Sequence, residues 1–131
     1  MPRLACYMAN MATIRYLVRD VNESIAFYTE GLGFKCERQF GPAMAILRRD
    51  DLTLWLAGPP ASAAKPMPDG RHPEPGGWNR FVIQVDELEA VVKSLRERGT
   101  PFRNEIIAGP GGRQVLCEDP SGNPIELFEA A

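Results

Sequence analysis

The fold is decided by residues 12–34, which read ATIRYLVRDVNESIAFYTEGLGF. Apolar residues alternate with others over 12–18, and a period of two predicts a half-buried strand. One face of this strand carries Ile14, Tyr16 and Val18, and the other carries Thr13, Arg15 and Leu17. After it, Asp20 and Asn22 are suitable caps for a helix N-terminus, and apolar residues recur at helical spacing until Gly31. The stretch therefore predicts a strand followed by a helix.

Three further strands are predicted after this helix, over 34–40, 43–48 and 52–57. The composition then changes, because residues 58–77 contain six of the twelve prolines. Such a stretch is typical of a long exposed connection. Loops of this length also cover binding sites, so both an inert connector and a lid fit the pattern.

The second half of the chain repeats the first. Its patterns predict a strand, a helix and three strands, over 79–85, 86–98, 102–107, 113–118 and 124–129. Asp86 opens the predicted helix, and Glu89 three residues later makes a variant of the capping box. Gly99 ends it.

In this repeat Asp20 corresponds to Glu87, and Trp55 corresponds to Glu126. An internal repeat of this kind indicates two copies of one structural unit. The sequence therefore predicts an α+β fold of two tandem βαβββ modules within a single domain over 12–131. We assign an N-terminal arm to 1–11, the first module to 12–57, the connection to 58–77 and the second module to 78–131.

Composition excludes several classes of protein. The chain has 131 residues, 44% of them hydrophobic, with 15 basic against 17 acidic residues. A chain of this length can bury a core without disulfides, and nearly balanced charge without a basic cluster argues against a nucleic-acid partner. No apolar run approaches the roughly 20 residues that a membrane helix needs, so no membrane association is expected. Cys6, Cys36 and Cys117 are widely spaced, which favours free thiols in the cytoplasm.

Several motifs resemble those of the vicinal oxygen chelate superfamily, the glyoxalase, bleomycin-resistance and extradiol-dioxygenase group. They are IRYLVRD at 14–20, AFY at 26–28, GLGF at 31–34 and DPSGNPIEL at 119–127. The resemblance covers about residues 12–129. It implies that each module curls a four-stranded sheet around a cup-shaped cavity with its helix on the convex side. It also implies a homodimer, since members of the family commonly dimerise.

The resemblance further implies where a metal would bind. In metal-dependent members the ligands come from the first and last strands of each module, and they are His or Glu with occasional Gln. The matching positions here are Thr13, Trp55, Arg80 and Glu126. Only Glu126 is a usable ligand, whereas a site for iron, zinc or nickel needs about three or four donors. We therefore predict no metal and no other cofactor, with a divalent ion as the disfavoured alternative.

The same mapping places a set of side chains in the cavity without a metal. The predicted ligand contacts are Thr13, Arg15, Trp55, Arg80, Gln84, Glu126 and Phe128. Trp55 either stacks on a planar ligand or fills the core. Arg80 and Glu126 either form a structural salt bridge, or they act catalytically, with Arg80 holding an oxyanion and Glu126 as general base. Trp78 is either a lid contact or a packing residue at a strand end, and packing is favoured.

These residues favour a protein that binds or sequesters a hydrophobic or aromatic small molecule without a metal. The alternative is a lyase, isomerase or dioxygenase relative that uses an unrecognised metal site or the Arg80 and Glu126 pair. A subunit of an assembly with a filled cavity is a third possibility, because a fold alone does not determine function.

Overall fold

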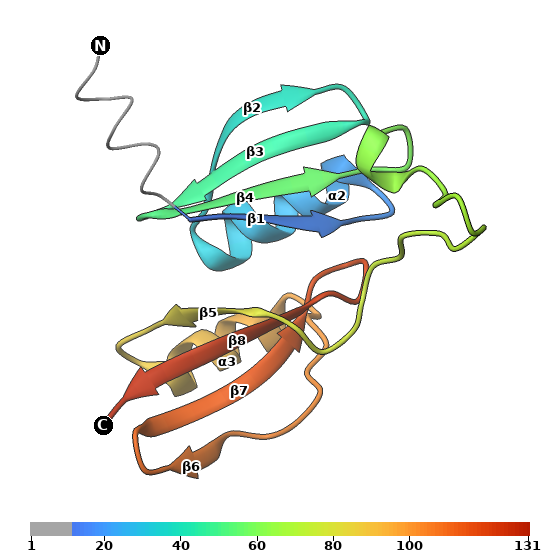
Figure 1. The fold of residues 1–131 in the computed structure, drawn as a ribbon. Helices are drawn as coiled ribbons and strands as arrows, with labels where there is room; N and C mark the ends of the chain where they lie inside the picture. The colour runs from blue at the N-terminus through green and yellow to red at the C-terminus, as the bar shows by residue number, and fades with distance from the viewer. Residues whose placement is uncertain (1–11) are drawn as a thin grey trace, which may run out of the picture. The chain divides into compact units, whose positions relative to one another are not determined.

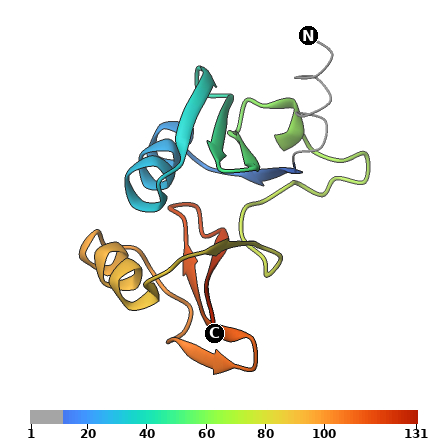
Figure 2. The same cartoon turned by 90° about the vertical axis from the view of Figure 1, so that its left-hand side faces the viewer.

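The computed structural model describes residues 12–131, which form two compact units. The division falls between Glu74 and Pro75, inside the predicted connection. The predicted arm over 1–11 lies outside the described residues. In each unit a helix lies against one face of a four-stranded sheet (Figures 1 and 2). None of the helices in residues 12–131 has the length and apolar character needed to cross a bilayer.

The first unit has the order strand, helix and three strands. Its elements are β1 (Ala12–Leu17), α2 (Val21–Ala26), the π-helical turn η1 (Phe27–Gly31), β2 (Lys35–Phe40), β3 (Met44–Arg49), β4 (Leu52–Ala57) and the short 3-10 turn η2 (Ser62–Ala64). The strands lie in the order β1-β4-β3-β2, with β1 parallel to β4 and the other pairs antiparallel. Asp20 caps α2 as predicted, because its Oδ1 accepts a hydrogen bond from the backbone N–H of Glu23 at 3.0 Å.

The second unit repeats this order. Its elements are β5 (Phe81–Gln84), α3 (Leu88–Glu97), β6 (Ile107–Gly109), β7 (Gly112–Glu118) and β8 (Pro124–Ala130). The strands lie in the order β5-β8-β7-β6, again with one parallel pair, β5 and β8. The predicted α+β fold of two βαβββ modules is therefore confirmed.

Each sheet buries the face that is covered by its helix. On these faces the fully buried strand residues are Ala45, Leu47, Leu54 and Leu56 in the first unit and Val115, Cys117, Ile125 and Leu127 in the second. Tyr28 of η1 and Leu95 of α3 are fully buried from the helical side. Since strand side chains alternate between faces, the residues between these positions form the opposite face of each sheet. That opposite face is where the predicted ligand contacts lie.

The second strand of the second module was predicted over 102–107, and that prediction is wrong, because β6 covers Ile107–Gly109. Phe102 makes only an isolated bridge to Cys117. The side chain of Asn104 takes the place of one backbone partner, since its Oδ1 accepts from the backbone N–H of Leu116 at 2.9 Å. Side chains of this type compete with ladder hydrogen bonds and end a strand.

The predicted start of the second helix is also wrong. Helix α3 begins at Leu88 with Glu87 at the N-cap, and Glu87 makes no side-chain cap bond. The cap comes from Glu129 on β8, whose Oε2 accepts from the Leu88 backbone N–H at 3.1 Å. The same carboxylate accepts hydrogen bonds from Arg113. A residue 41 positions away thus satisfies the helix terminus.

Glu129 makes the stability of the second unit depend on pH. The hydrogen bond from Arg113, followed by the one from the Leu88 backbone, lowers the pKa of Glu129 below its ordinary value. A carboxyl whose pKa is lower in the folded state stabilises the fold above its unfolded pKa of about 4.3, and this contribution is lost as pH falls through the folded pKa. The difference in stability between wild type and Glu129→Gln should therefore be constant near neutral pH and shrink in acid.

Urea unfolding from pH 7 down to about pH 3 measures this difference. Glu97→Gln is the matched control, since Glu97 is an exposed glutamate on α3. A Glu129→Gln difference that stays constant across the whole acid range would contradict the assignment.

Candidate functional site

In the first unit, the sheet face opposite α2 carries three rows of side chains. We call it the Trp55 face. The strand register sets its rows as Thr13, Thr53, Arg48 and Lys35; Arg15, Trp55, Ile46 and Arg38; and Leu17, Ala57, Met44 and Phe40. Three of the predicted contacts, Thr13, Arg15 and Trp55, lie on this face.

Trp55 and Arg15 form the centre of the Trp55 face. They are direct neighbours on the parallel strands β1 and β4, and the guanidinium carbon of Arg15 lies 4.9 Å from the centroid of the indole ring. This distance is within the range of a cation–π contact. Trp55 is half-buried and lies on the opposite face from the core under α2. Its ring is therefore a flat, partly accessible surface rather than core filling.

In the second unit, the sheet face opposite α3 carries the other four predicted contacts, Arg80, Gln84, Glu126 and Phe128. Glu126 on β8 neighbours Val82 on β5 and Leu116 on β7. Gln84 and Phe128 are neighbours in the next row. Glu126 is only 9% exposed, so its charge needs a partner.

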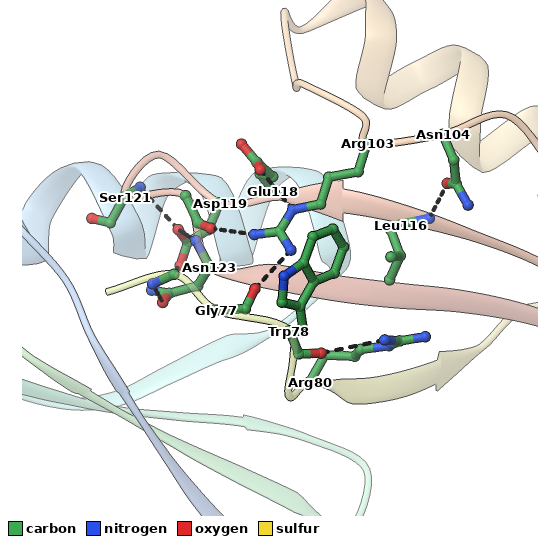
Figure 3. Close-up of polar contacts among 12 residues, drawn as sticks. Gly77, Trp78, Arg80, Arg103, Asn104, Leu116, Glu118, Asp119, Ser121 and Asn123 are labelled. Atoms are coloured by element: carbon green, nitrogen blue, oxygen red, sulfur yellow. Dashed lines mark hydrogen bonds and ion pairs between the residues drawn. The ribbon is translucent and has the colours of Figure 1, made fainter. Parts of the chain in front are cut away.

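Arg80 is the partner of Glu126. Its Nε and Nη2 atoms donate to Oε1 of Glu126 at 3.1 and 2.9 Å. Its Nη1 donates to the backbone carbonyl of Trp78 at 3.2 Å (Figure 3). The predicted contact between Arg80 and Glu126 is therefore present, with the geometry of a partly buried salt bridge.

Sequence reasoning missed Arg103, which lies at the centre of the polar cluster in Figure 3. Arg103 Nε donates to Glu118 at 2.7 Å, Nη1 to the carbonyl of Gly77 at 2.7 Å, and Nη2 to the carbonyl of Gly122 at 3.0 Å. Its guanidinium also lies 4.5 Å from the centroid of the Trp78 ring. Arg103 thus fastens the segment before β5 to the turn between β7 and β8.

Trp78 does not pack in the way that the sequence favoured. Its side chain is 69% exposed, and its ring contacts the guanidinium of Arg103 rather than an apolar strand end. An arginine can hold an aromatic ring at the surface in this way because the contact survives in water. No pattern in the sequence connects positions 78 and 103, so only the folded chain reveals the pair.

The donor set does not fit the metal site of the family. Of the four matching positions only Glu126 offers a carboxylate, and Arg80 already binds its Oε1. Within residues 12–131, no three His, Cys, Asp or Glu side chains are grouped closely enough to hold an ion. Burial raises the pKa of the Cys117 thiol to about 12, so this cysteine is protonated at neutral pH and is not a ready ligand.

A family model matches residues 10–127, and its description is the Glyoxalase/Bleomycin resistance protein/Dioxygenase superfamily. The chain belongs to this superfamily. This membership agrees with the resemblance carried by the motifs at 14–20 and 119–127 and with the two βαβββ modules. No match was found among curated proteins.

Solved structures of the superfamily resemble the chain over most of its length. A superfamily member from Sphaerobacter thermophilus is 26% identical, with a TM-score of 0.72, and the match covers 91% of this chain and 95% of that one. TnmS3, an antibiotic binding protein from a Streptomyces species, is 25% identical, with a TM-score of 0.71 and coverage of 93% and 96%. A lactoylglutathione lyase from Agrobacterium tumefaciens is 18% identical, with a TM-score of 0.71 and coverage of 92% and 93%, and this likeness concerns the fold alone.

Proposed function

We propose that this superfamily member binds a hydrophobic or aromatic small molecule without a metal. One observation carries the proposal: Glu126, the single donor among the four ligand positions, is bound by two nitrogens of Arg80. A guanidinium stays protonated in proteins and cannot coordinate a cation. A metal would have to displace Arg80 and then find about two more donors, which the matching positions do not offer.

The Trp55 face supports the binding role. Trp55 presents an indole ring with Arg15 beside it, and aromatic rings of this kind stack on planar ligands. Exposed apolar residues also lie on the sheet face opposite the helix in each unit, namely Phe40 in the first unit and Val82 and Ile107 in the second. The likeness to TnmS3, an antibiotic binding protein, supports a small molecule as the ligand.

We place this activity in the cytoplasm and in a homodimer. Cys36 and Cys117 are free thiols, which suits a reducing compartment. The homodimer follows from the family resemblance, and the cup-shaped cavity implied by that resemblance stays a prediction.

Acid–base catalysis by Arg80 and Glu126 is the second candidate, and their direct contact is the observation in its favour. A base must reach the proton that it removes, and here Oε1 of the carboxylate is occupied by its own neighbour. We therefore assign Glu126 the role of holding Arg80 in place.

The experiment combines metal analysis with ligand binding. Purified protein, before and after dialysis against EDTA, is screened by thermal shift against planar aromatic compounds, and the metal content of both samples is measured. We expect substoichiometric metal and binding that EDTA does not change. Trp55→Ala should weaken binding about tenfold through the lost stacking surface, while Trp78→Ala serves as the matched control.

Stoichiometric zinc, nickel, manganese or iron that is lost in Glu126→Ala would overturn the metal-independent assignment. Binding that is equally strong in Trp55→Ala would overturn the role of the Trp55 face, and a screen without any binder would overturn the function itself.

A further inference from the structure

Positive charge is concentrated on the Trp55 face although the whole chain has a formal net charge of -2. This face carries Arg15, Lys35, Arg38 and Arg48. Arg48 is paired with the carboxylate of Glu37 at 3.3 Å. Within residues 12–131, Arg15, Lys35 and Arg38 form no ion pair. An acidic protein that gathers unpaired cations on one face attracts anions there.

The cations on this face stand beside aromatic rings. Arg15 lies over Trp55 at 4.9 Å, and Arg38 lies over Phe40 at 5.1 Å. The central row therefore begins and ends with a guanidinium and has Trp55 and Ile46 between them. A flat apolar molecule fits the middle of this row, and an acidic group on it would meet an arginine at either end.

A hollow lies at the end of the face where β2 begins and β3 ends. Its volume is about 430 Å³, and it is lined by Gly33, Lys35, Arg48, Arg49 and Asp50. Asp50 is already paired with Arg49 at 3.5 Å. Arg48 and Trp55 are diagonal neighbours on adjacent strands, a spacing of about 7–8 Å. One small molecule can therefore place a ring on Trp55 and an anionic group toward Lys35 and Arg48.

From these observations we infer that the Trp55 face selects aromatic small molecules that carry an anionic group, namely a carboxylate, sulfonate or phosphate. This inference rests on the proposed function and names its ligand class. A single-stranded nucleic acid also combines rings with negative charge, but it needs a groove that follows its backbone. The cations here stand in short rows beside a small open hollow, which suits a small molecule.

The test uses the full chain in a Trp78→Phe background, so that Trp55 supplies the single indole N–H signal in an NMR titration. Three probes share one ring system and differ in charge: 2-naphthoate, naphthalene-2-methanol and 2-naphthylmethylammonium. At about 50 mM salt we expect 2-naphthoate to bind at least about fivefold more tightly than the alcohol, and the ammonium to bind most weakly. At about 0.5 M salt the preference for 2-naphthoate over the alcohol should narrow, because Arg15, Lys35 and Arg38 are exposed and salt screens their charge.

Arg38→Gln should reduce the preference for 2-naphthoate over the alcohol about threefold. Lys65→Gln is the matched control, since Lys65 is exposed and lies outside the face. Equal affinity for all three probes would overturn the inference and leave the proposed function standing. If no probe shifts the Trp55 indole signal, both the inference and the proposed function are wrong. Tighter binding of an oligothymidylate than of 2-naphthoate would assign the face to nucleic acid instead.

Discussion

Asp119→Ala is expected to lower the free energy of unfolding by about 3 kcal/mol. Asp119 is only 2% exposed, and its Oδ1 accepts from the backbone N–H groups of Ser121 and Asn123 at 2.8 and 2.9 Å. Its Oδ2 accepts from the side-chain amide of Asn123 at 3.0 Å. Alanine would leave two buried backbone donors without these acceptors, and each such donor costs about 1–3 kcal/mol.

The effect should reach beyond the turn itself. Asn123 Oδ1 accepts from the backbone N–H of Gly76 at 2.7 Å, so the turn also holds the segment that precedes β5. Amide exchange at Gly76 should therefore accelerate in Asp119→Ala. Chemical unfolding gives the stability change, and Asp119→Asn is the matched control because it keeps an oxygen at the Oδ1 position. A loss below about 1 kcal/mol in the alanine variant would show that the turn does not depend on this carboxylate.

Gly112→Ala is expected to be similarly damaging, at about 3 kcal/mol. Gly112 has a φ of 152°, which L-residues rarely adopt. A Cβ atom here would overlap the backbone carbonyl oxygen of Glu129, and it would lie 3.0 Å from both the Cα of Ala130 and the ring of Phe128. Backbone cannot move aside as a flexible side chain can, so the end of the β7–β8 pair would have to separate.

Gly111→Ala is the matched control for this variant. The nearest atom to a Cβ at Gly111 is in the ring of Phe128 at 3.9 Å, an ordinary contact distance. Chemical unfolding and amide exchange at the ends of β7 and β8 measure both variants. If Gly112→Ala and Gly111→Ala unfold at the same denaturant concentration, the close approach of these backbones is not real.

Much of the fold could be predicted because local patterns and tertiary structure agree. Strand β4 was predicted over 52–57 and is found at Leu52–Ala57, since a short apolar run bounded by turn residues is a strong signal. The start of α3 could not be predicted, because its cap comes from Glu129 on another strand. Strand β6 was misplaced because the Asn104 side chain binds the backbone of β7, and this contact has no local signature.

The site was predictable where the repeat aligned the two modules. The correspondence of Trp55 with Glu126, and the position of Arg80, led to the contact between Arg80 and Glu126 that the structure contains. The position of Arg38 on the Trp55 face was missed because Arg38 does not follow the simple alternation of its strand. Arg103 was missed because its partners, Gly77 and Gly122, contribute backbone carbonyls, which any residue could supply.

The alternation fails in β2 because the register shifts between Cys36 and Arg38, so that Glu37 is an extra residue in the strand. If β2 alternated regularly over the same residues, Gln39 would lie on the same side of the sheet as Lys35, and Arg38 and Phe40 would lie on the other side. Loss of the Glu37 codon would make the strand regular, keep Arg38 and Phe40 on the side of Lys35, and remove the carboxylate that is paired with Arg48. A descendant with this single deletion would present the same side chains with one negative charge fewer beside them, and it would attract anions more strongly.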